Sequence, residues 1–230
     1  MSVMLYYAAT KTVGVADLAQ DEVVRPSVQK EEGAPVVPTK ENEIAIDRTE
    51  MSTNYFCIPM PESVKAEEVV LENHYMDKEL WVCINTEQKK DYEAFYRTTG
   101  VYGYSDNVAD GHFEAEQDRI CLCFALNGVY EYRSIFEDHT LYVEFVSSKE
   151  MYEKIIVIDP AYGGEEQGVA VEGILSKDIT LDVAKALKTM FDESDVKVYY
   201  TRMDDTNPAA SDRVGLAAAT KADMLIRIEV

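Results

Sequence analysis

The stretch that decides the fold of the second half of the chain is IIVIDPAYGG, residues 155–164. Its four apolar residues are all β-branched, which is typical of a strand that is buried on both faces in a parallel sheet. The run ends at Asp159 and continues into a turn that closes with Gly163 and Gly164. This pattern predicts a buried strand that delivers a loop, with Tyr162 in it, to a functional site.

Helical and strand patterns alternate after this first strand. Residues 176–194 open with Ser176 or Asp178 as the candidate N-cap and carry apolar side chains at helical spacing, namely Ile179, Val183, Leu187, Met190 and Phe191. A second strand, a second helix opened by Asn207-Pro208 and a third strand follow, at residues 196–202, 207–223 and 224–230. This order predicts a small α/β domain with a parallel sheet of three strands.

The middle of the chain shows the period-2 alternation of β-strands instead. The segment RICLCFALNGVYEY, residues 119–132, alternates apolar side chains up to Asn127-Gly128, which predicts a hairpin turn there. Other strand-like runs surround it, and residues 89–100 form a helical or irregular excursion. These patterns predict a small antiparallel β domain, and no catalytic constellation is visible in it.

The first 53 residues differ from both of these regions. Residues 20–53 are polar and rich in Glu, Lys and Pro, as in an extended linker. The apolar start lacks a basic segment and is interrupted by Lys11, so it is neither a good signal peptide nor a membrane span. The predicted class is α+β overall, with an N-terminal antiparallel β domain and a truncated α/β parallel-sheet domain. The boundaries are 1–53, 54–150 and 151–230.

Charge and cysteine content limit the classes of partner. The chain has 22 basic and 43 acidic residues, a net charge of −21, which opposes binding to nucleic acid or, by charge alone, to an anionic membrane. The cysteines show no CxxC spacing, and two of them lie on one face of a strand; the four are Cys57, Cys83, Cys121 and Cys123. We interpret them as small buried apolar residues in preference to a disulfide or a metal site.

In open α/β sheets, ligands bind beyond the carboxyl ends of the strands. The side chains expected at that edge form a glycine-rich, mostly acidic mouth, made of Asp159, Tyr162, Gly163, Gly164, Glu165, Glu166, Glu172, Arg202 and Glu229.

Four spaced motifs in this half share one resemblance. They are DPAYGG, SKD, VYYTRMDDT and SDRVGLAAATKADMLIRIEV, at residues 159–164, 176–178, 198–206 and 211–230. Together they resemble the first half of the catalytic domain of the zinc-dependent N-acetylmuramoyl-L-alanine amidases, which cut between glycan and stem peptide in bacterial cell walls. The resemblance implies a zinc cofactor and a cell-wall substrate.

The departures from the family pattern fall on its zinc ligands. In the family these are a histidine in the first motif, a glutamate opening the second and a histidine ending the third strand. The matching positions here are Tyr162, Ser176 and Glu229. A catalytic zinc takes three ligands from His, Cys, Asp or Glu, so only Glu229 qualifies. The three histidines of the chain lie in the β domain, and the catalytic glutamate that the family carries late in its domain has no counterpart.

The resemblance and its departures predict a catalytically degenerate amidase relative, with no catalytic residue, metal or cofactor, that acts as a peptidoglycan-associated binding or regulatory module. One alternative is an active amidase with a different metal set, in which Glu229 joins Glu172, Glu165 or Glu166; another is a fragment of a longer amidase. The resemblance implies a location outside the cytoplasm, at the cell envelope. The unpaired third strand favours self-association or a protein partner.

Overall fold

A computed structural model describes residues 15–16, 42–49, 53–116 and 118–230. These residues form two compact units. The first contains residues 15–16, 42–128 and 132–145, and the second contains 129–131 and 146–230. Most of the predicted linker and most of the apolar start lie outside the described residues. The division at 53 and 150 stays a proposal, and each unit is described here by itself.

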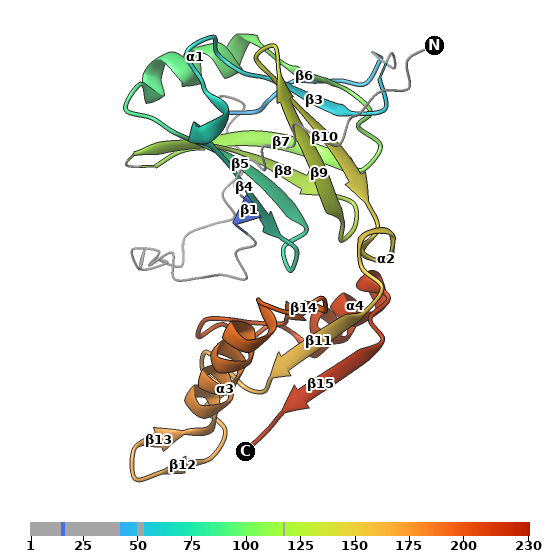
Figure 1. The fold of residues 1–230 in the computed structure, drawn as a ribbon. Coiled ribbons are helices and arrows are strands. Elements are labelled where there is room, and N and C mark those ends of the chain that lie inside the picture. The colour runs from blue at the N-terminus through green and yellow to red at the C-terminus, as the bar shows by residue number, and fades with distance from the viewer. Residues whose placement is uncertain (1–14, 17–41, 50–52, 117) are drawn as a thin grey trace. The chain divides into compact units, whose positions relative to one another are not determined.

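The first unit contains two five-stranded sheets. One has the order β1-β4-β5-β8-β7, with bounds Val15–Ala16, Val69–His74, Glu79–Asn85, Arg119–Leu126 and Val108–Ala115. The other has the order β2-β6-β3-β10-β9, with bounds Ile46–Asp47, Val101–Gly103, Phe56–Pro59, Thr140–Val146 and Glu131–Glu137. Pairing is antiparallel except between β1 and β4 and between β2 and β6. The predicted β-rich domain is therefore present (Figure 1).

The apolar side chains of the two sheets meet in a common core. Phe56 of β3 and Phe124 of β8 are both fully buried, and their ring centroids lie 5.0 Å apart in an edge-to-face arrangement. Residues 89–100, the predicted excursion, contain helix α1, Lys89–Thr98, which buries Tyr92 and Tyr96. Short helix η1, Ala66–Glu68, precedes β4. Strand β8 is buried over five consecutive residues, 120–124, so both of its faces are covered.

The hairpin predicted at Asn127-Gly128 is wrong. Strand β8, which ends at Leu126, pairs with β5 and β7, whereas β9 pairs with β10 in the other sheet. The turn therefore carries the chain from one sheet to the other. The amide side chain of Asn127 donates to the Asp106 carbonyl at 2.8 Å and fixes this crossing. Asn-Gly tolerates positive φ, but neither residue has it here, so the local signal did not determine the pairing.

The interpretation of all four cysteines as simple apolar residues is also wrong. All four are fully buried, as expected, but Cys83 and Cys121 form a disulfide with a sulfur–sulfur distance of 2.10 Å. The two residues are partners in the β5–β8 register. Cys57 and Cys123 are free thiols. Pairing across 38 positions of sequence depends on strand register, which the spacing of the cysteines does not reveal.

The second unit is built on a parallel sheet of order β14-β11-β15, with bounds Lys197–Tyr200, Ile155–Pro160 and Met224–Ile228 (Figure 1). Short helix α2, Ser148–Met151, leads into it, and the hairpin β12–β13, Ala170–Val171 and Ile174–Leu175, precedes helix α3, Ser176–Phe191. Helix α4, Ala210–Thr220, precedes β15. The α+β class predicted from the sequence is confirmed.

The two longer helices of this unit cover opposite faces of the sheet. Ala184 of α3 packs in a cluster with Ile158, whereas Arg213 of α4 bonds to Asp159. Neighbouring residues of a strand point to opposite faces, so the helices lie on different sides.

Helix α3 differs from its prediction in two details. Leu175 is the N-cap residue, and Ser176 is already helical. The buried face consists of small side chains four residues apart (Ser176, Thr180 and Ala184), which bring the helix close to the sheet. Of the bulkier predicted core residues, Leu187 and Phe191 pack against the core cluster. The other three, Ile179, Val183 and Met190, are exposed by 39%, 38% and 73%. Helix α4 likewise starts at Ala210 instead of at Asn207-Pro208.

Within the described residues, no helix has the length and apolar content that crossing a membrane requires.

Candidate functional site

Asp159, at the carboxyl end of β11, is the centre of a buried polar network. Its Oδ1 atom accepts hydrogen bonds from Thr201 Oγ1 at 2.6 Å and from Arg213 at 2.5 Å. Its Oδ2 atom accepts one from Arg227 at 2.7 Å. Burial raises the pKa of Asp159, but these hydrogen bonds outweigh burial and hold the pKa below its usual range. Asp159 is therefore a fixed negative charge.

The loop after β11 has a backbone that few sequences tolerate. Tyr162 and Gly163 both have positive φ, at 66° and 130°. A Cβ atom on Gly163 would lie 1.9 Å from the carbonyl oxygen of Thr206, so only glycine fits there. Asp205 accepts from the Gly164 amide at 2.9 Å and from Lys177 at 2.6 Å. The loop is thus held rigidly at the mouth of the sheet.

Arg202 lies beneath this loop and supports it. Its side chain is only 2% exposed. The guanidinium donates to the carbonyls of Pro160, Ala161, Lys177 and Asp204 and to the Thr180 hydroxyl. Burial and the neighbouring Arg213 charge lower the pKa of Arg202. A guanidinium satisfied by so many protein acceptors acts as scaffold for the mouth.

The three positions that the motifs predict to correspond to the family's zinc ligands converge at the end of the third strand. The Tyr162 hydroxyl donates to Glu229 Oε1 at 3.0 Å. Ser176 Oγ donates to the main-chain oxygen of Val230 at 2.9 Å and accepts from the Val169 amide at 3.1 Å. The substituted side chains therefore contact the end of the third strand directly.

These residues do not fit the three-ligand zinc set. The hydrogen bond to Glu229 raises the pKa of the Tyr162 phenol, which therefore remains a neutral donor and not a phenolate ligand. Ser176 offers a hydroxyl, which is outside the usual ligand types. Glu229 remains, and it also accepts from Arg227 Nε at 3.3 Å. In the part of the chain that the structure describes, no group of three His, Cys, Asp or Glu side chains is placed to hold a metal ion.

The remaining predicted acidic residues of the mouth are exposed. Glu166 accepts from the Asn207 side chain at 3.2 Å, and Glu165 follows Gly164 on the surface. Glu172 occupies the turn between β12 and β13 with φ of 52°. Among the described residues, they are not assembled with Glu229 into a three-ligand site.

Arg227 is the residue of this site that the sequence motifs did not indicate. Its guanidinium bonds both to Asp159 and to Glu229, and so links the buried network to the mouth. The register of the two strands could have indicated this role of Arg227. Asp159 and Arg227 are direct partners in the parallel register of β11 and β15, and Glu229 is two residues further on, on the same side of the chain.

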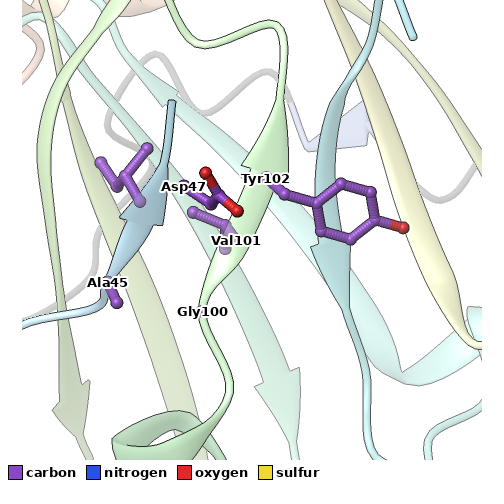
Figure 2. A pocket seen from close by; sticks show the side chains of 6 residues that line it. Ala45, Asp47, Gly100, Val101 and Tyr102 are labelled. Carbon is purple, nitrogen blue, oxygen red and sulfur yellow. The ribbon is translucent and has the colours of Figure 1, made fainter. Parts of the chain in front are cut away.

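The first unit has a groove of its own. It encloses about 550 Å³ and is lined by Ala45, Ile46, Asp47, Gly100, Val101 and Tyr102 (Figure 2). Asp47 Oδ1 in this groove accepts hydrogen bonds from the Thr49 amide and hydroxyl, at 2.8 and 2.7 Å. These six lining residues include no histidine, cysteine or cation.

Residues 156–229 match the family described as N-acetylmuramoyl-L-alanine amidase. Among relatives, the N-acetylmuramoyl-L-alanine amidase LytC of Bacillus subtilis is 34% identical over 73 residues, which cover 32% of this chain and 15% of that protein. The endolysin of Bacillus phage SPP1 is 33% identical over 78 residues, which cover 34% of this chain and 29% of that protein. An amidase structure from Clostridium difficile 630 is 32% identical, with a TM-score of 0.32, and covers 34% of this chain and 43% of that one.

Residues 156–229 are thus similar to the N-acetylmuramoyl-L-alanine amidase family, as the motifs indicated. The chain spans well under half the length of the curated relatives it matches, from 12% to 37%.

Proposed function

We propose that this protein is a catalytically degenerate amidase relative, a peptidoglycan-associated binding or regulatory module of the cell envelope that holds no catalytic zinc. One observation carries the proposal. The side chains at two of the three zinc-ligand positions, Tyr162 and Ser176, use their hydroxyl protons in hydrogen bonds to residues 229 and 230. A hydroxyl that donates to a neighbouring oxygen is not available as an anionic metal ligand.

The chemistry of the mouth supports the same conclusion. Hydrolysis of an amide requires a group that activates water and a group that stabilises charge on the carbonyl oxygen. Glu229 is the carboxylate at a ligand position, and both of its oxygens already accept hydrogen bonds, from Tyr162 and from Arg227. A carboxylate engaged with a cation and a phenol is a poor general base.

The binding role follows from what the segment retains. The rigid loop with Gly163, the Asp205–Lys177 pair and the buried Asp159 network keep the shape of the mouth. The family of the segment supplies the expected ligand, the glycan and stem peptide of bacterial cell walls, and the expected location at the cell envelope. Self-association or a protein partner is also proposed, because β15 is an edge strand of the described sheet.

The function is tested by incubating the full chain with purified insoluble peptidoglycan. We expect the protein to sediment with the peptidoglycan and to release no stem peptide, with or without added Zn²⁺. Tyr162→Ala, in the mouth, should reduce sedimentation, and Tyr104→Ala, at an exposed position of the first unit, should not. Zn²⁺-dependent release of stem peptide would instead favour an active amidase, and a chain that stays in the supernatant would contradict the binding role.

A further inference from the structure

Strand β15 is held in the sheet by unusually little apolar burial. It pairs with β11 on one side and is the edge of the described three-stranded sheet. Its residues Met224, Leu225 and Ile226 are 55%, 40% and 38% exposed. Because burial of apolar area is the main favourable term in packing a strand, β15 requires other contacts to stay in place.

Polar contacts gather at the carboxyl end of this strand. Glu229 accepts from Tyr162, and the main-chain oxygen of Val230 accepts from Ser176. Arg227 reaches back to Asp159 at 2.7 Å. Together these contacts tie three separate elements to one strand end, namely the loop after β11, the first turn of α3 and β11 itself.

We infer that Tyr162, Ser176, Arg227 and Glu229 form a metal-free clasp that anchors the end of β15. A metal ion with one ligand from each of the loop, α3 and β15 would likewise tie the loop and α3 to the end of β15. Here direct hydrogen bonds make the connection. This inference rests on the contacts alone and does not depend on the proposed peptidoglycan-binding role.

Charge balance supports the clasp. Asp159 and Glu229 are both carboxylates at one edge of the sheet, and a cation between them is needed to offset their repulsion. The Arg227 guanidinium lies between them and bonds to both, at 2.7 and 3.3 Å. It thus supplies the positive charge between the two carboxylates. A guanidinium suits this task because its planar donors bond two carboxylates at once.

Packing supports it as well. A Cβ atom on Gly168 would lie 2.6 Å from the Ser176 Cβ and 2.9 Å from the Tyr162 ring. Gly168, with φ of 67°, therefore closes tightly against both side chains. The Tyr162 ring and the Ser176 side chain therefore both pack directly against Gly168.

Hydrogen exchange of the β15 amides in the full chain tests the clasp. Tyr162→Phe, Glu229→Ala and Ser176→Ala should each raise the exchange rate of residues 224–228. Because the contacts of Tyr162 and Glu229 are exposed, we expect increases of about two- to fivefold for those two variants. Tyr104→Phe and Glu193→Ala, at exposed positions outside the clasp, are the matched controls and should leave the β15 rates unchanged.

The double variant Tyr162→Phe/Glu229→Ala separates a shared contact from two independent ones. If the two residues act through one hydrogen bond, the double variant exchanges no faster than the faster single variant. The inference would be overturned if the β15 amides of all clasp variants exchanged at the wild-type rate. It would also be overturned if the effects of the two substitutions on that rate were fully additive in the double variant. These exchange rates are measured without peptidoglycan. The clasp can therefore be disproved while the proposed binding role stands, and the reverse also holds.

A second test restores metal ligands at the same positions. In the triple variant Tyr162→His/Ser176→Glu/Glu229→His, the convergence of the three side chains predicts that added Zn²⁺ raises the Tm, whereas Zn²⁺ leaves the Tm of the native chain unchanged. A folded triple variant with a zinc-independent Tm would show that the three positions do not converge as the clasp requires. If the triple variant does not fold, the exchange rates of the single variants decide.

Discussion

Asp159 and Arg213 form a buried ion pair across two elements of the α/β unit, with Arg213 Nη1 lying 2.5 Å from Asp159 Oδ1. Asp159 lies near the end of strand β11 and Arg213 lies in α4, and both side chains are at most 6% exposed. The same arginine also donates to the Pro160 and Tyr162 carbonyls. The pair therefore fixes the helix, the strand and the loop of the mouth relative to one another.

Removal of the Asp159 charge should destabilise the second unit strongly. Asp159→Asn leaves Arg213 and Arg227 without their shared carboxylate, and breaking one side of a buried pair costs about 3–5 kcal/mol. The free energy of unfolding of Asp159→Asn, measured by urea titration of the full chain, should therefore be lower than that of the native chain by about 3–5 kcal/mol. Asp195→Asn, at an exposed position, should change it little. Equal stabilities of the two variants would contradict the structural role of the pair.

Acid should destabilise the protein through Asp159 and Glu72. Burial raises the pKa of Glu72, but hydrogen bonds from His74 and Arg119 outweigh burial and hold the pKa below its usual value. The pKa of Asp159 is lowered in the same way, by its hydrogen bonds with Thr201, Arg213 and Arg227. A carboxyl group whose pKa is lower in the folded state contributes full stability above its unfolded pKa of about 4. That contribution is lost as the pH falls below about 4 toward the folded pKa. Urea titrations at stepped pH should show this decrease.

Asp159→Asn provides the control for the acid dependence. The variant lacks one of the two titrating groups, so its stability should fall less steeply than that of the native chain below pH of about 4. Identical pH slopes for the two proteins would show that the Asp159 carboxylate does not have a lowered pKa.

Reduction of the Cys83–Cys121 disulfide should destabilise the first unit. The bond closes a segment with a sequence separation of 38, and cross-links of this kind contribute about 2–4 kcal/mol, largely through the unfolded chain. The free energy of unfolding of Cys83→Ala/Cys121→Ala should therefore not change on addition of a reducing agent, whereas that of the native chain should fall. Cys57→Ala, which removes a buried free thiol, should keep the native response to reduction.

Local sequence signals predicted the second unit well and the first unit only in part. The strands at β11, β14 and β15 were visible because a parallel sheet buries near-continuous apolar runs, as IIVIDP shows. The hairpin predicted at Asn127-Gly128 was wrong because a two-residue turn signal cannot distinguish a hairpin from a connection between two sheets. The Cys83–Cys121 bond was missed for a similar reason, since it depends on the register of β5 and β8.

The motifs predicted the residues of the candidate site but not the contacts between them. Spacing placed Tyr162, Ser176 and Glu229 at matching positions, but their hydrogen bonds depend on side-chain directions that only the folded chain defines. Arg227 was overlooked because a lone arginine in an apolar strand usually faces solvent. Its role appears only when β15 is set in register beside Asp159.

The exposed edge of β15 should drive self-association of the full chain. Unpaired strand edges invite pairing with another chain, and a lysine placed on an edge discourages it. Sedimentation velocity should show a dimer or larger species, and Ile226→Lys should shift it toward monomer. Val183→Lys on α3 is the matched control, because Val183 and Ile226 are both 38% exposed and only Ile226 lies on the edge strand. A native chain that is monomeric at high concentration would contradict this expectation.

The most direct test of the proposal that the site is degenerate is the zinc content of the full chain after incubation with excess Zn²⁺ and exhaustive dialysis. Because Tyr162 and Ser176 donate hydrogen bonds and only Glu229 is a normal ligand, we expect far less than one zinc ion per chain. Retention of one zinc ion per chain, removed by a chelator together with an amidase activity, would show that the site is a working zinc centre and not a degenerate one.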